Sequence, residues 1–398
     1  MPLGIYVSVP FCRTKCSYCN FASDVFSRAV FERYVDRVCS DIENASQVAA
    51  EMGGRMERAV DSIYLGGGTP TVLETAQLER IFGKVRREFE VGPEAEITVE
   101  CAPGTLTAAM LGTLLRCGVN RVSLGVQSFV DQEAAAVGRL HKRTTVLEDV
   151  ARLRAAGITN INIDLIAGLP HQTAESWELS LTEAIASGVP HVSVYMLEVD
   201  EDSRLGRELL AGGTRYHAHF VPDEEATADF YLMACQRLES AGIAQYEISN
   251  VAREGFESRH NLKYWKRQPY FGFGVDAHSM LISATADLDA VRFAHADSLE
   301  KYVDGTALQR TAVSRWEAFE ESFFLGLRLT RGIHLGELAA HFGEDDMEKA
   351  RTTVTEFVEA GLMECRGDFV CLTSRGRLLS NEVFQRFIVA EEAPRLTT

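Results

Sequence analysis

The sequence lacks both a long hydrophobic run and an export signal. No window approaches the ~18 to 20 uninterrupted apolar residues that a membrane-spanning helix needs. The N-terminus, MPLGIYVSVPFC, has neither the basic start nor the long apolar core of a signal peptide. We therefore expect a cytoplasmic protein without a membrane span.

Positive charge is scarce as well. Lys and Arg number 40 against 57 Asp and Glu, which gives a formal net charge of -17. Such a balance repels phosphate backbones and anionic lipid heads. Nucleic acid is thereby excluded as a general partner.

The cysteines do not form an even, regularly spaced set. There are nine, and three of them crowd together at Cys12, Cys16 and Cys19 while the other six are scattered. In a chain without an export signal this clustering favours metal binding over disulfides.

The cluster has the spacing C-x3-C-x2-C, in the stretch that follows the first predicted strand. Three thiolates on one loop can each reach a different iron of one cubane, whereas a closed zinc site normally needs a fourth Cys or His nearby. No fourth ligand is obvious. A zinc site completed from elsewhere and three unliganded cysteines both stay open at this point.

Short β-branched runs alternate with longer amphipathic stretches up to about residue 200, which is typical of β-α units around a parallel sheet. The predicted strands are Ile5–Val9, Ser62–Leu65, Glu96–Val99, Arg121–Leu124, Ile161–Leu165 and His191–Met196. The predicted helices are Phe31–Met52, Ala76–Phe89, Ala108–Arg116, Val146–Ala156 and Glu175–Ala186. Six such units predict an α/β fold, a partial (β/α)6 barrel of TIM type, with its ligands at the strand-to-helix loops.

Two further regions follow the predicted barrel of residues 1–200. Residues 201–313 contain a helical stretch at Glu224–Ala241 and an aromatic, glycine-rich passage, and we expect them to form an extension against the barrel. Residues 314–398 predict three helices, a hairpin at Leu362–Cys365 and Phe369–Leu372, and a final helix from Arg375, which resembles a winged-helix module. Its net charge of -5 favours an interaction or lid role over DNA binding.

Polar residues and glycines gather where the predicted strands end. The glycine-rich turn Gly66-Gly67-Gly68-Thr69-Pro70 follows the second strand, and glycines allow a ligand to approach the backbone. An unpaired polar group in a buried strand costs about 1 to 3 kcal/mol, so polar strand ends need partners. Helix capping is the structural alternative for each. The four candidates are Glu100, Gln127, Arg139 and Asp164.

The cysteine spacing and the preceding I-Y-V-S-V-P-F-C resemble the radical S-adenosylmethionine superfamily, in the branch of oxygen-independent coproporphyrinogen III dehydrogenases and haem chaperones. The resemblance extends over nearly the whole chain. It implies a barrel of radical S-adenosylmethionine type, a [4Fe–4S] cluster on the three cysteines, and S-adenosylmethionine on the fourth iron. It also implies a cofactor-binding set: Tyr6, Gly67, Gly68, Thr69, Glu100, Gln127, Arg139 and Asp164.

Two features distinguish members of this branch. The dehydrogenase typically has a further Cys two residues after the third, where this chain has Phe21, and a longer segment before the motif. The sequence His260-Asn261-Leu262-Lys263-Tyr264-Trp265 resembles the H-N-x-x-Y-W motif of the haem chaperones. If it is helical, His260 and Tyr264 share one face and can flank a porphyrin together with Trp265.

The resemblance therefore implies a protein that binds haem and passes it to a haem-requiring acceptor, with a reductant for the cluster. Whether S-adenosylmethionine cleavage serves this transfer stays open. A structural alternative is that His260 caps a helix while the two aromatic residues fill the core. His278 is a second candidate haem ligand, and Asp276 stands where the family usually has a small residue. The competing functions are oxidative decarboxylation of coproporphyrinogen III and a zinc-stabilised interaction protein.

Overall fold

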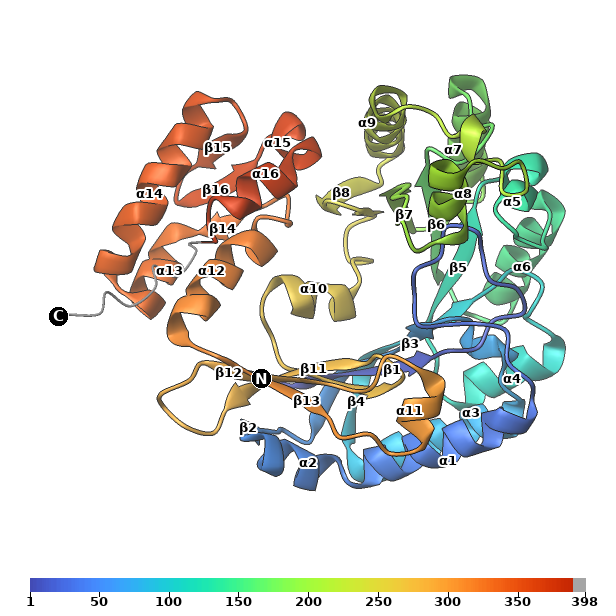
Figure 1. The fold of residues 1–398 in the computed structure, drawn as a ribbon, viewed down its shortest axis with the longest axis horizontal. Coiled ribbons are helices and arrows are strands. Elements are labelled where there is room, and N and C mark those ends of the chain that lie inside the picture. The colour runs from blue at the N-terminus through green and yellow to red at the C-terminus, as the bar shows by residue number, and fades with distance from the viewer. Residues whose placement is uncertain (389–398) are drawn as a thin grey trace.

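The computed structural model describes residues 1–388, in which a large sheet lined by helices is followed by a small helical domain with a sheet of its own (Figure 1). The order of strands in the large sheet is β13-β12-β11-β10-β1-β3-β4-β5-β6-β7-β9-β8, and β2 pairs with β11. The strands are β1 Leu3–Val9, β2 Gly54–Arg55, β3 Ala59–Gly67, β4 Glu90–Cys101, β5 Arg121–Gln127, β6 Asn160–Ala167, β7 His191–Met196, β8 Ala244–Glu247, β9 Asn250–Ala252, β10 Tyr270–Gly274, β11 His278–Ser283, β12 Ala290–Ala294 and β13 Gln309–Val313.

The parallel part of this sheet confirms the predicted fold class. Strands β10-β1-β3-β4-β5-β6-β7 run parallel, and all but β10 are the strands expected from the sequence. Helices connect them on the outer side. These helices are α1 Ala29–Glu43, α2 Ala45–Met52, α3 Thr75–Glu88, α4 Ala108–Arg116, α5 Asp131–Ala136, α6 Arg143–Ala155 and α7 Ala174–Ala186, with a short 3-10 helix at Pro70–Val72.

One predicted helix of the barrel is wrong. The stretch Phe31–Met52 forms two helices, because Asn44 lies between α1 and α2 in a non-helical conformation. The Asn44 side-chain amide donates a hydrogen bond to the carbonyl of Ser40 at 2.8 Å. The same carbonyl also accepts a hydrogen bond from the Asn44 backbone amide at 3.0 Å, so Asn44 closes the last turn of α1 twice.

Residues 201–313 do not form a separate layer but extend the large sheet at both edges. Strands β8 and β9 continue it beyond β7, and β10 to β13 continue it beyond β1. Figure 1 shows α10 between the strands of the barrel and the C-terminal domain. The helices of this region are α8 Arg204–Ala211, α9 Glu224–Ser240, α10 Arg259–Trp265 and α11 Leu299–Val303, with a 3-10 helix at Ala218–Phe220.

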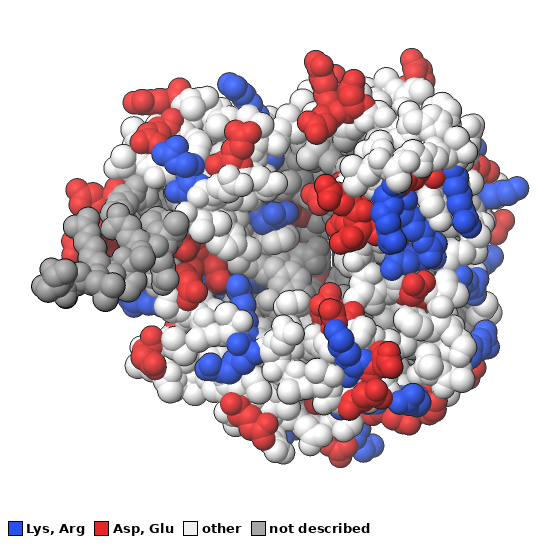
Figure 2. Space-filling model, in the orientation of Figure 1, with Lys and Arg blue, Asp and Glu red and all other residues white. Residues whose placement is uncertain are grey.

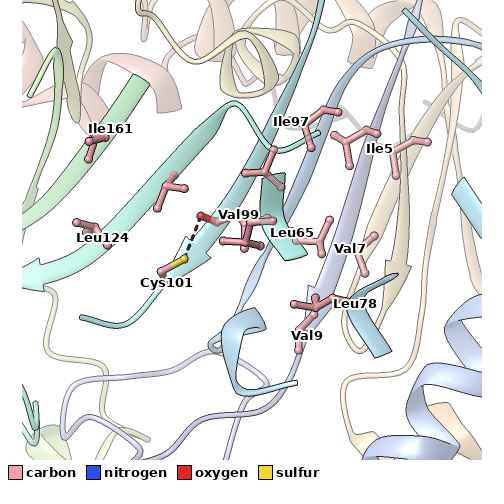
Figure 3. Close-up of a cluster of buried hydrophobic side chains, with 14 of the residues drawn as sticks. Ile5, Val7, Val9, Leu65, Leu78, Ile97, Val99, Cys101, Leu124 and Ile161 are labelled. Atoms are coloured by element: carbon pink, nitrogen blue, oxygen red, sulfur yellow. Dashed lines mark hydrogen bonds between the residues drawn. The ribbon is translucent and has the colours of Figure 1, made fainter. Parts of the chain in front are cut away.

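Side chains alternate between the two faces of the barrel strands, because successive residues of a strand point in opposite directions. The outer face is apolar: Ile5 is in register with Ile63 and Ile97, and Val7 with Leu65 and Val99. Figure 3 shows this layer, with Leu78 of α3 against it. The inner face is polar. The residues that alternate with the apolar ones along these strands include Tyr6, Ser62, Tyr64, Glu96, Glu100 and Arg121.

The C-terminal region forms a second domain around its own apolar core. The order of its elements confirms a winged-helix-like arrangement, with the additional short strand β14 between the first two helices. The predicted single final helix from Arg375 is wrong, because this segment forms two short helices, α15 and α16. Phe323 and Phe387 stack in its core with ring centroids 4.6 Å apart. The elements are α12 Arg315–Gly326, β14 Ile333–His334, α13 Leu335–Phe342, α14 Glu344–Glu359, β15 Met363–Arg366, β16 Phe369–Leu372, α15 Ser374–Leu378 and α16 Ser380–Gln385.

We propose domain boundaries at 1–200, 201–313 and 314–398. The second apolar cluster supports the last boundary, because most of its residues lie between Val313 and Phe387. Over residues 1–388, every helix is too short or too polar to cross a bilayer.

Candidate functional site

The three clustered cysteines lie on one loop directly after β1. The Cys12 amide donates to the carbonyl of Asp24 at 3.0 Å, and the Cys19 amide donates to the carbonyl of Cys16 at 3.3 Å. The Cys16 side chain is buried, while Cys12 and Cys19 are half-buried. Burial raises the pKa of the Cys12 and Cys19 thiols, and the neighbouring cysteines raise both values further. The loop thus brings three sulfur ligands near one another at the carboxyl end of β1.

The described residues contain no converged site for a single metal ion. Within residues 1–388, no three His, Cys, Asp or Glu side chains converge as ligands of a single ion. A cubane does not need that convergence, because each of its cysteines binds a different iron atom. Three cysteines on one loop are compatible with such a cluster.

The glycine-rich turn after β3 packs directly behind the cysteine loop. The Gly68 amide donates to the Val9 carbonyl and the Thr69 amide donates to the Phe11 carbonyl, both at 2.7 Å. A Cβ on Gly68 would lie 2.6 Å from the Phe11 carbonyl oxygen and 3.0 Å from Cys12 Sγ. Gly67 has a φ of 99°, which only glycine adopts without strain. The turn fixes the position of the cysteine loop as well as lining a ligand site.

A Gly68→Ala variant is expected to displace the cysteine loop. The clash is with backbone atoms, which cannot rotate away, so we expect the free energy of unfolding to fall by about 1 to 3 kcal/mol. Iron incorporated on anaerobic reconstitution should fall with it. Chemical denaturation and iron analysis measure the two effects.

Gly83→Ala is the matched control. Nothing lies within 4 Å of a Cβ at Gly83, which is in α3. Alanine there should leave the iron content unchanged and stabilise the chain by about 0.5 to 1 kcal/mol. Equal iron content in Gly68→Ala and wild type would contradict the role given to the turn.

Glu100 lies on the inner face of the barrel beside the glycine turn. The hydroxyl of Tyr64 donates to Glu100 Oε1 at 2.7 Å, and the Gly67 amide donates to Oε2 at 3.2 Å. Burial raises the pKa of Glu100 to about 7, and Asp164 contributes to the rise. The carboxylate is thus held in a defined orientation beside the glycine turn, where a cationic ligand group would favour its charged form.

Arg139 links the cysteine loop to the end of β5. Its Nη1 donates to Cys16 Sγ at 3.5 Å, and its Nη2 donates to the Gly125 carbonyl. Its Nε is buried without a hydrogen-bond partner in the structure. Gln127, at the end of β5, has a φ of 70° and is buried. A guanidinium with an unsatisfied donor beside the Cys16 sulfur suits an anionic group.

Asp164, on β6, is the last of the polar residues that were predicted at the strand ends. Its Oδ1 accepts a hydrogen bond from Asn162 Nδ2 at 2.7 Å, and its Oδ2 accepts one from Ser123 Oγ at 3.2 Å. Burial raises its pKa. Because the strands are parallel, Glu100, Gln127 and Asp164 lie at the same edge of the sheet as the cysteine loop. The structure thus places these predicted site residues together.

The segment from His260 to Trp265 is helical, as the sequence predicted, but it lies inside the barrel. His260 is 1% exposed and sits in α10 against the amino-terminal half of β3. Its Nδ1 lies 3.0 Å from Ser62 Oγ, and its Nε2 lies 2.8 Å from the Tyr264 hydroxyl. Burial, together with the charges of Lys263 and Arg121, lowers the pKa of His260 to about 3. The imidazole is therefore neutral near pH 7.

Aromatic rings connect this helix with the site at the strand ends. The ring centroid of Tyr64 lies 6.1 Å from that of Tyr6 and 5.4 Å from that of His260. The Tyr264 ring meets the His260 ring edge-on, with centroids 5.2 Å apart. Trp265 follows, with the Arg328 guanidinium 4.4 Å from its ring centroid. The barrel interior thus has one continuous aromatic column.

His278 lies at the surface of the protein. Its side chain is 65% exposed and its Nε2 lies 3.8 Å from Asp276 Oδ1, just after the carboxyl end of β10. Asp276 has a φ of 56° and its side chain is half exposed. His260 and His278 therefore occupy different environments, one buried and one open.

The sequence matches the family described as Radical SAM superfamily over residues 6–184 and the HemN C-terminal domain over residues 313–379. A Bacillus subtilis protein named Heme chaperone HemW is 34% identical over 96% of this chain and 98% of its own length. The Escherichia coli protein of the same name is 31% identical over 97% of this chain and 98% of its own. This chain belongs to the haem chaperone branch of the radical SAM superfamily.

The solved structure of coproporphyrinogen III oxidase (HemN) from Escherichia coli shares the fold of this radical SAM chain. The TM-score is 0.81 at 24% identity, over 97% of this chain and 90% of the other. A likeness at this identity establishes the architecture. The shared architecture includes the extension and the C-terminal domain as well as the barrel.

Membership of the radical SAM superfamily implies a [4Fe–4S] cluster and S-adenosylmethionine, and the residues present fit both. Three thiols on one loop provide three sulfur ligands. The unpartnered Arg139 Nε and the polar strand ends offer partners for the charged groups of an amino acid. The glycine turn leaves no side chain between the backbone and such a ligand.

Sequence reasoning missed two residues of this radical SAM site. Tyr64 orients Glu100, and Arg121 lies 2% exposed in the barrel interior. Both follow the two-residue alternation of their strands, at positions in register with Tyr6 and Thr98. Applying that alternation to every strand, rather than looking only at strand ends, would have identified them.

Proposed function

We propose that this protein binds haem and transfers it to a haem-requiring acceptor protein, and that it holds a [4Fe–4S] cluster with S-adenosylmethionine. The names of the full-length relatives support this function. The observation that carries it in this chain is a neutral, buried imidazole within an aromatic column. Neutral imidazole is the form that ligates haem iron.

His260 is the haem ligand in this proposal, and its hydrogen bonds define what binding requires. If the Tyr264 hydroxyl donates to Nε2, then Nδ1–H donates to Ser62. The Nε2 lone pair is then the one available to iron, once Tyr264 moves away. Tyr264 and Trp265 would supply apolar contact for the porphyrin.

The eight residues Tyr6, Gly67, Gly68, Thr69, Glu100, Gln127, Arg139 and Asp164 would hold S-adenosylmethionine, beside the cluster ligands Cys12, Cys16 and Cys19. When bound and reduced, the cluster supplies the electron for cleavage of the sulfonium. The protein orients the ligand: Glu100 faces the glycine turn, and Arg139 lies against Cys16. The reductant, the acceptor and a cytoplasmic location also belong to this proposal.

The dehydrogenase function has less support in this chain. Phe21 replaces the further cysteine expected of that enzyme, and its side chain is 63% exposed. The shared fold with the oxidase does not decide between the two functions, because one fold hosts many activities.

Haem titration of the anaerobically reconstituted protein tests the proposal. We expect saturable binding near one haem per chain, followed by Soret absorbance, and transfer to a haem-free acceptor enzyme that regains activity. Coproporphyrinogen III incubated with the same preparation, reductant and S-adenosylmethionine should remain unconverted. Decarboxylation of this substrate without haem binding would establish the alternative function.

A further inference from the structure

Four cations form a basic patch over the cysteine loop: Arg13, Lys15, Arg204 and Arg215. They line a pocket of about 520 Å³ in which Asp24 is the single carboxylate among the lining residues. Figure 2 shows a group of basic side chains on the side of the molecule where Figure 1 shows the N-terminal loop.

The basic patch borders acidic side chains but is not ion-paired with them among the described residues (Figure 2). No ion pair within 4.0 Å among residues 1–388 involves any of its four members, although Asp and Glu outnumber Lys and Arg by 57 to 40 in the chain. The Asp24 carboxylate accepts a hydrogen bond from the Val25 amide at 2.7 Å instead. Instead of a carboxylate, Arg204 contacts the Lys15 carbonyl, to which it donates at 3.3 Å, and the Arg215 guanidinium lies 5.4 Å from the Tyr216 ring centroid.

The floor of the pocket touches a cluster ligand. Gly138 and Arg139 line the pocket, and a Cβ on Gly138 would lie 3.7 Å from Cys16 Cα. Arg139 Nη1 donates to Cys16 Sγ at 3.5 Å. The Thr14 hydroxyl, which also lines the pocket, donates to the Gly138 carbonyl at 3.0 Å. A protein seated on the patch would be separated from Cys16 by one layer of residues.

We propose that the basic patch docks a small acidic protein that carries single electrons and reduces the cluster. Charge complementarity defines the partner, and the exposed apolar side chains Val25 and Leu140 in the same pocket provide a contact centre. In the step, the reduced carrier loses one electron and the cluster gains it, passing from the 2+ to the 1+ state, with no bond formed or broken. This inference rests on the proposed function, in which the cluster must be reduced.

The test compares Arg13→Glu/Lys15→Glu with the control Arg58→Glu/Arg87→Glu in the reconstituted full chain. Arg58 precedes β3 at the opposite end of the barrel, and Arg87 is exposed on α3, so the control changes the net charge equally. The probe is purified flavodoxin in its hydroquinone form. Stopped-flow absorbance gives the rate of cluster reduction, and calorimetry with oxidised flavodoxin gives the Kd. Photoreduced deazaflavin, a small uncharged reductant, reports on the cluster itself.

The patch variant should be reduced by flavodoxin about tenfold more slowly at low salt and bind it correspondingly more weakly, with less dependence on ionic strength. The control variant should match wild type, and deazaflavin should reduce all three equally. Equal rates and Kd values for patch variant and wild type would overturn the proposal, as would equal losses in patch and control variants. Slow reduction of the patch variant by deazaflavin as well would also overturn it, because the cluster itself would then be altered.

Haem titration of the same variants separates this inference from the proposed function. The patch variant should bind haem as wild type does. If wild type binds no haem but flavodoxin still reduces it through the patch, the chaperone function is refuted while the docking surface stands.

Discussion

Cys16→Ala should lose the cluster almost completely on anaerobic reconstitution. Iron per chain should fall from about four to below one, because a cubane with only two cysteine ligands is poorly held. Of the three proposed ligands, Cys16 is the most tightly built into the structure: it is buried, and Arg139 donates to its sulfur. Analysis of iron and acid-labile sulfide measures the loss. The absorbance at about 400 nm serves as a check.

Cys101→Ala is the matched control for that variant. Cys101 is equally buried, but it lies in the apolar outer layer and its thiol is 3.8 Å from the Val99 carbonyl oxygen (Figure 3). Both variants lose one buried sulfur, so both should be destabilised by about 1 to 2 kcal/mol. Only Cys16→Ala should lose iron. A full complement of iron in Cys16→Ala would remove this residue from the cluster.

His260→Ala should weaken haem binding at least about tenfold and shift the Soret band, because an axial ligand is lost. Tyr264→Phe should act in the opposite direction. It removes the hydroxyl that occupies Nε2, so iron no longer competes with a hydrogen bond worth about 1 kcal/mol, and affinity should rise about fivefold. Haem titration followed by Soret absorbance measures both.

Two further variants make this result interpretable. His260 is fully enclosed, so denaturation curves must show that His260→Ala still folds. Ser62→Ala removes the hydrogen-bond partner of Nδ1, and it reports how much stability is lost with one contact of the imidazole ring. His278→Ala should bind haem as wild type does. Loss of binding in His278→Ala with retention in His260→Ala would transfer the ligand role to the exposed imidazole.

The sequence was sufficient for the barrel strands because each is a short β-branched run followed by a recognisable helix. It was also sufficient to predict that Glu100, Gln127 and Asp164 share one edge, since parallel strands end together. The pairing of β10 with β1 was not predictable in the same way, because it joins segments more than 260 residues apart. Such pairing depends on tertiary packing rather than local pattern.

The helix of His260 illustrates a different limit. Spacing predicted that His260 and Tyr264 share one helix face, and they do. The sequence did not reveal that each is the other's hydrogen-bond partner inside the barrel, because burial of a short polar helix depends on the polar inner face of the strands. The basic patch is a further case: a net charge of -17 describes the whole chain and conceals four cations from two segments that line one pocket.

The most direct test of the account is Mössbauer spectroscopy of the wild-type protein reconstituted with ⁵⁷Fe, recorded with and without S-adenosylmethionine. Three protein sulfur ligands leave one iron of the cubane for the nucleotide, so about a quarter of the iron should change its isomer shift and quadrupole splitting when S-adenosylmethionine is added. Four iron sites that do not respond to the nucleotide, or a preparation without iron and sulfide, would contradict it.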